Sequence, residues 1–71
     1  MKWEFKKVPL ISEVATTEDG RLALTLVFNE GWHSTLLNVN ENVTITCVKV
    51  PTREEAITKV EALARKLGWL A

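Results

Sequence analysis

PTREEAITKVEALARKLG, the stretch from Pro51 to Gly68, decides the fold of this chain. Its apolar residues recur at steps of three and four, which predicts one helix with a single apolar stripe. Thr52 and Glu55 have the spacing of a capping box, in which each side chain bonds a backbone N–H of the first turn. The members of the stripe are Ala56, Ile57, Val60, Leu63, Ala64 and Leu67.

The C-terminal end of this predicted helix also has recognisable sequence signals. Arg65 and Lys66 suit the negative end of a helix, and Gly68 suits a left-handed residue just beyond it. Trp69 would then be placed to fold back over Ala64. A stripe of this kind needs an apolar partner layer, so we expect the preceding residues to form a sheet that the helix covers.

Size and composition limit the classes of protein to consider. The 71 residues form one small α+β domain, 1–71, whose core is marginal for a chain of this length. Cys47 is the single cysteine and His33 the single histidine, which excludes an internal disulfide and the usual zinc ligand sets. We predict no cofactor and no metal. A partner surface becomes a more probable source of additional stability.

Charge and hydropathy bear on the partners. Nine basic residues balance nine acidic ones, whereas nucleic-acid binders usually carry a basic excess. The sequence has neither a secretory signal nor an apolar run of about 18 residues that could span a membrane. We therefore expect a cytoplasmic protein with no membrane association.

The sequence of the N-terminal half predicts β-strands. Lys2 to Val8 alternates, with Trp3 and Phe5 on one side, and Pro9 ends this strand or places it at a sheet edge. Ile11 to Thr17 and Arg21 to Phe28 read as a hairpin. On its second strand we expect the core face to carry Leu22, Leu24, Leu26 and Phe28, with Ala23, Thr25 and Val27 on the other face.

The turn of this hairpin has two possible lengths. A two-residue Asp19-Gly20 loop pairs Glu13 with Leu26 and puts a carboxylate among leucines. A three-residue loop, with Gly20 left-handed, pairs Glu13 with Thr25. We expect the second, because register follows the apolar face.

The strand from Trp32 to Val39 is ambiguous by one residue. Either Trp32, Ser34 and Leu36 face the helix, or His33, Thr35, Leu37 and Val39 do. A three-residue loop, Asn40-Glu41-Asn42, would pair Val39 with Val43 and Leu37 with Ile45. We therefore expect the residues under the helix to be Leu37, Val39, Val43, Ile45 and Cys47. The expected fold is α+β: an antiparallel β-meander of three to four strands with one C-terminal amphipathic helix packed on one face (ββββα).

The sheet face away from the helix is the main functional clue. Between Leu22 and Val48 the only charged residues are Glu30 and Glu41, and both fall in turns. A solvated sheet face usually alternates apolar with charged residues, and uncharged patches tend to mark interaction surfaces. The opposing interpretation is that Thr, Val and Trp are simply good strand formers. The predicted interface residues are Trp32 as anchor, with Leu36, Val27, Val48, Thr25 and Thr46.

We predict a non-catalytic interaction module, an accessory, adaptor or inhibitor type of protein that is homodimeric or binds another protein chain. The predicted binding surface is the open sheet face or an exposed edge strand. His33 and Cys47 are the only candidates for nucleophilic catalysis, and no oxyanion loop or orienting carboxylate accompanies them. A lone cysteine in an alternating strand is usually a small buried hydrophobe. We predict that the protein is not an enzyme.

Nucleic-acid binding is the alternative. Val50 followed by Thr52-Arg53-Glu54-Glu55-Ala56 is similar to the strand–helix junction of small DNA-binding domains with a three-stranded sheet, over the last third of the chain only. The resemblance implies a sheet presented to DNA or RNA. The contacts in that case would come from Arg21, Lys49, Arg53, Lys6 and Lys7.

Overall fold

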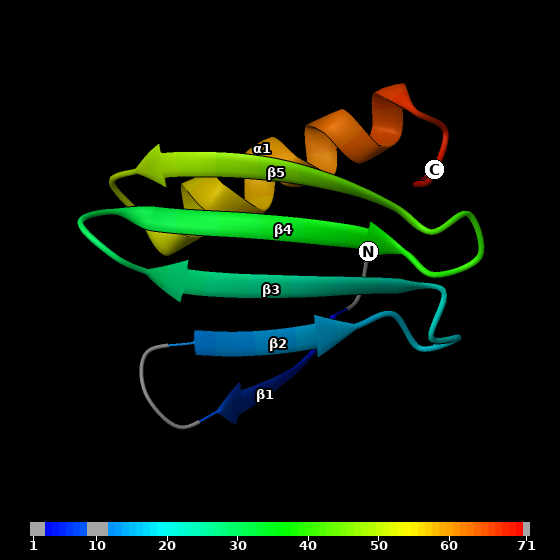
Figure 1. The fold of residues 1–71 in the computed structure, drawn as a ribbon, viewed down its shortest axis with the longest axis horizontal. Coiled ribbons are helices and arrows are strands. Elements are labelled where there is room, and N and C mark those ends of the chain that lie inside the picture. The colour runs from blue at the N-terminus through cyan, green and yellow to red at the C-terminus, as the bar shows by residue number, and fades with distance from the viewer. Residues whose placement is uncertain (1–2, 9–11, 71) are drawn as a thin grey trace.

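A computed structural model describes residues 3–8 and 12–70 of the chain. Five strands form one antiparallel sheet in the order β1-β2-β3-β4-β5, and helix α1 packs on one of its faces (Figure 1). This confirms the α+β meander with a C-terminal helix, with one strand more than the three to four predicted. The elements are β1 (Glu4–Val8), β2 (Ser12–Thr16), β3 (Leu22–Phe28), β4 (Trp32–Asn38), β5 (Val43–Val50) and α1 (Arg53–Lys66).

Both ends of α1 are capped, although the capping box predicted at its N-terminus is only half formed. The Thr52 hydroxyl accepts from the backbone N–H of Glu55 at 3.1 Å. Gly68 has the left-handed φ of 79°. The N–H of Trp69 donates to the carbonyl of Ala64 at 2.9 Å, which is the Schellman hydrogen bond that spans the larger number of residues. The second half of the capping box is not formed with a described residue, because Oε2 of Glu55 is buried with no hydrogen-bond partner among them.

The core lies between α1 and the middle of the sheet. Alternate residues of β3 are almost fully buried, as are one leucine of β4 and the inner stripe of the helix. Trp69 and Leu70 close the core where α1 ends. The most deeply buried apolar residues are Leu22, Leu24, Leu26, Leu36, Ala56, Val60 and Ala64.

The register predicted for the β2–β3 hairpin is wrong. Glu13 lies opposite Leu26 rather than Thr25, and four residues, Glu18 to Arg21, separate the hydrogen-bonded pair Thr17 and Leu22. The carboxylate of Glu13 is tolerated beside the leucines because Arg53 binds it with two N–H groups, at 2.8 and 2.9 Å. A register chosen only by matching apolar residues across the two strands does not take this distant cation into account.

The face assigned to β4 is also wrong by one residue. Leu36, at 0 % exposure, lies under the helix with Ser34, whereas Leu37 is half-buried on the opposite face and Val39 is half exposed. Asn38 rather than Val39 lies opposite Val43, so the turn is one residue longer than predicted.

Two polar residues on the inner face of β4 explain this difference. The hydroxyl of Ser34 donates to the carbonyl of Ala56 at 2.9 Å. The side chain of Asn38 accepts from the backbone N–H of Glu41 at 3.1 Å and donates to its carboxylate at 3.3 Å. Each buried polar group is satisfied, so the cost of burying it is largely offset.

The prediction for β5 is correct. Ile45 and Cys47 are half-buried and pack against the core, and Val43 shares their face although it is 44 % exposed. A bulge follows, because two residues, Val48 and Lys49, lie between the partners of Ser34 and Trp32. Lys49 has φ 54°, which returns the strand to register so that Val50 is buried.

The first strand is held by the last element of the chain. The indole N–H of Trp3 donates to the carboxylate of Glu61 at 2.8 Å. The guanidinium of Arg53 lies 4.6 Å from the ring centre of Phe5. Trp3 and Phe5 share a face, as predicted, and β1 is an edge strand; the predicted breaker Pro9 lies outside the described residues.

Candidate functional site

The open face of the sheet, defined here by the nine residues of β3, β4 and β5 that point away from α1, carries no charged side chain. Figure 1 shows α1 on the other side of the sheet, behind β4 and β5. Strand alternation and the observed pairing identify the members of this face. They are Ala23, Thr25, Val27, His33, Thr35, Leu37, Thr44, Thr46 and Val48.

Threonines form a row across the middle of the open face. Thr25 lies opposite Thr35, and Thr35 lies opposite Thr46. Val14 of β2 extends the row on one side, and beyond it Lys6 of β1 brings the first charge. An uncharged surface therefore covers four of the five strands, from β2 to β5.

The structure separates the predicted interface residues into two groups. Val27, Val48, Thr25 and Thr46 lie on the open face, as predicted. Trp32 and Leu36 lie on the helix face, where Leu36 is fully buried and Trp32 packs on the core. Their predicted place on the open face is wrong because the residues of β4 that face the helix are shifted by one position. Trp32 therefore cannot be the anchor of an interface on the open face.

Leu37, Thr35 and His33 occupy the places that the sequence assigned to Leu36, Ser34 and Trp32. The only signal in the sequence for this arrangement is a polar residue able to bond locally, since Asn38 closes its own turn through Glu41. Leu37 is the largest apolar side chain in the middle of the open face. The open face thus carries a histidine where a tryptophan was predicted, and Leu37 is its largest aliphatic side chain on β4.

His33 and Cys47 do not come together. Nε2 of His33 lies 3.0 Å from the carbonyl oxygen of Asn29 on the open face, while Cys47 packs on the helix side. The sheet separates imidazole and thiol, so they form no nucleophile–base pair. Within residues 3–8 and 12–70, no three His, Cys, Asp or Glu side chains gather as metal ligands would.

The basic residues named for nucleic-acid binding are dispersed. Arg53 is bound by Glu13 and Glu54, which raises the pKa of its guanidinium further. Arg21 lies at the opposite end of the sheet, and its side chain donates to the carbonyl of Trp69 at 3.2 Å. Lys6 and Lys49 are on the two edge strands, and the side chain of Lys7 is outside the described part. No common basic surface joins the described members of this set.

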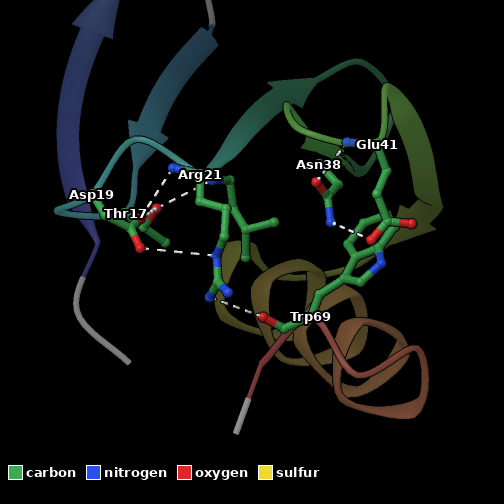
Figure 2. Close-up of polar contacts among 7 residues, drawn as sticks. Thr17, Asp19, Arg21, Asn38, Glu41 and Trp69 are labelled. Atoms are coloured by element: carbon green, nitrogen blue, oxygen red, sulfur yellow. Dashed lines mark hydrogen bonds and ion pairs between the residues drawn. The ribbon is translucent and has the colours of Figure 1, made fainter.

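The polar groups at the end of the sheet where β2 and β4 finish are structural (Figure 2). The Thr17 hydroxyl donates to Asp19 at 2.7 Å, and the backbone N–H of Arg21 donates to the same carboxylate oxygen at 3.0 Å. These bonds, with the nearby charge of Arg21, lower the pKa of Asp19 below its ordinary value. They hold the β2–β3 turn, and Arg21 joins that turn to the residues after α1.

Comparison with known proteins gives no family assignment, since no family model, curated protein or solved structure matches the chain. In the part of the chain that the structure describes, α1 is neither long nor apolar enough to cross a bilayer. The surfaces of the protein are therefore the guide to its function.

Proposed function

We propose that this protein is a non-catalytic protein–protein interaction module that binds another chain through its open sheet face. The observation that carries the proposal is the absence of charge on that face from β2 to β5. Ordinary solvated sheet faces place charged residues between the apolar ones. Here threonines, valines, an alanine and a leucine take those positions.

A second copy of the chain is the occupant we propose for this face. Two uncharged faces can pack together with no like charges brought close, and valine, threonine and leucine side chains suit sheet-on-sheet packing. Such a dimer has a two-fold axis, so each face binds the same patch on its mate.

The size of the face sets the expected strength. The four strands β2 to β5, spaced about 4.8 Å apart and about seven residues long, cover roughly 450 Å². Stable interfaces bury about 800 Å² on each partner. We therefore expect a weak association that grows with protein concentration.

Sedimentation equilibrium over a range of concentrations tests the proposal. Thr35→Lys places a charge in the middle of the open face, and we expect it to abolish the dimer. Thr58→Lys is the matched control, because Thr58 is exposed on α1. Both variants should keep the circular dichroism spectrum of the parent. A parent that stays monomeric at all concentrations, or a dimer insensitive to Thr35→Lys, would contradict the proposal.

A further inference from the structure

The free edge of β5 is a second surface, distinct from the open face. The N–H of Val39 donates to the carbonyl of Arg21, and that of Asn29 donates to Gly31, so odd-numbered residues of β3 and β4 bond each other. The even-numbered residues of β4 therefore bond β5, through its residues 43, 45 and 47. It follows that Thr44 and Thr46 direct their backbone N–H and C=O groups outward.

This edge lacks the features that usually keep edge strands from pairing. Native proteins protect such strands with charges, bulges and proline. β1, the other edge, carries Glu4 and two lysines in five residues. β5 has no charged residue from Val43 to Val48, and its bulge comes only at Lys49. The first six residues of β5 are therefore a template for another strand.

An apolar groove runs beside this edge, under the flank of α1. Its volume is about 300 Å³, and its walls are Thr46 and Cys47 of β5 with Lys59, Ala62, Leu63 and Lys66 of α1. Leu63 is 39 % exposed. A strand added to β5 would direct every second side chain into this groove, because side chains alternate across a strand.

The charges at the groove identify the occupant. Lys59 and Lys66 are exposed, and neither forms an ion pair with any residue that the structure describes. They are seven positions apart in the helix, or about 10 Å along α1. Carboxylates at positions i and i+4 of a strand are about 13 Å apart, within the reach of these side chains, and position i+2 lies between them.

A second copy fits this edge poorly. α1 contacts both β4 and β5, so pairing of two β5 strands would bring two helices to roughly 10 Å from each other. Because such a contact is two-fold symmetric, the lysines of one groove would meet the same lysines of the other. Like charges at this distance oppose association.

We infer that the β5 edge binds an extended acidic segment of a partner protein. The segment pairs antiparallel with Thr44 and Thr46, places an apolar side chain against Cys47 and Leu63, and carries a carboxylate on each side for Lys59 and Lys66. This is strand addition, in which backbone bonds give affinity and alternate side chains give specificity. The inference does not depend on the open face.

The probe is the labelled peptide Thr-Glu-Thr-Leu-Thr-Glu-Thr, blocked at both ends, measured by fluorescence anisotropy. We expect binding that weakens with added salt. The peptide with both glutamates replaced by lysine should bind about tenfold more weakly or not at all. The double variant Lys59→Glu with Lys66→Glu should reverse this preference. Arg65→Glu is the matched control for a charge change in the last turn of α1, and it should keep the preference of the parent.

A second pair of peptides tests the pairing itself. In an antiparallel addition the threonines bond β5, because residues opposite each other share a face. N-methylation of the two central threonines should therefore abolish binding, whereas N-methylation of the leucine and one glutamate should not.

Equal binding of acidic and basic peptides, or no binding of either, would overturn the inference. So would backbone amide shifts at Thr44 and Thr46 that depend on protein concentration in the Thr35→Lys variant without peptide, since the open-face dimer is then absent and a second copy would occupy the edge. Loss of the open-face dimer in Thr35→Lys leaves these results unchanged, so the two proposals fail separately.

Discussion

Two adjacent leucines of β4 give the sharpest test of the structure. Leu36 is at 0 % exposure between β3, β5 and α1, whereas Leu37 is half-buried on the open face. Replacing a fully buried leucine by alanine costs about 2–5 kcal/mol, from lost burial and from the cavity that remains. We expect about 3 kcal/mol for Leu36→Ala and about 1 kcal/mol or less for Leu37→Ala.

The loss expected for Leu36→Ala is large compared with the total free energy of unfolding of this protein. At roughly 0.05–0.15 kcal/mol per residue, a chain of 71 residues has a free energy of unfolding of about 4–11 kcal/mol. Leu36→Ala would thus remove a quarter or more of it and lower Tm by roughly 12–24 °C.

Urea unfolding followed by tryptophan fluorescence and by circular dichroism measures both variants. The midpoint should fall for Leu36→Ala with an unchanged slope, while Leu37→Ala stays close to the parent. The two leucines are adjacent in the same strand and undergo the same substitution, so each variant is the control for the other. A larger loss for Leu37→Ala would mean that β4 has its other face toward the helix.

Three further changes probe single contacts. Ser34→Ala removes the hydroxyl bond to a buried helix carbonyl, and we expect thermal denaturation to show a loss of about 1–2 kcal/mol. Gly68→Ala should cost about 1 kcal/mol by the same measurement, because φ 79° is strained for any residue with a Cβ although nothing lies within 4 Å of the added atom. The pKa of Asp19 is lowered in the folded state, so its contribution is present above the ordinary value of 3.8 and is lost as the pH falls through the folded pKa. Asp19→Asn should therefore be less stable than the parent near neutral pH, and urea midpoints of the two should converge below about pH 4; a constant difference across that range would refute the role of the carboxylate.

The elements of this fold were predictable because their signals are local. The cap at Thr52, the apolar stripe of α1 and the glycine after it all lie within eighteen residues of sequence. The same is true of alternation within β3 and β5. The helix and the strand faces are confirmed, since no distant residue competes with the pattern. The predicted burial is wrong at three positions near the ends of these elements, because Phe28, Leu63 and Leu67 are exposed.

Register could not be predicted in two hairpins because distant or polar contacts decided it. Glu13 lies among leucines only because Arg53, forty residues later, binds its carboxylate. Asn38 is buried because it bonds its own turn through Glu41. Counting apolar residues ignores both effects, and a shift of one residue reverses the face of a whole strand.

The error in the register of β4 changed only part of the predicted open face. The uncharged character of the open face was predictable, because it depends only on the scarcity of charge between Leu22 and Val48. The residue at its centre was not, because that depends on the register of β4. Which edge strand would bind, and the lysines beside it, could not be predicted, since a groove between a strand and a helix flank has no pattern in the sequence.

The bond between Trp3 and Glu61 has a consequence for the order in which a growing chain acquires structure. A two-stranded hairpin alone is marginally stable in water, so β1 and β2 have little to hold them when they are first synthesised. Their contacts with Glu61 and Arg53 form only with α1, which is translated after all five strands. The contacts that secure β1 thus form only after the whole sheet has been translated, and nascent chains halted before α1 should expose β1 and β2 to proteases.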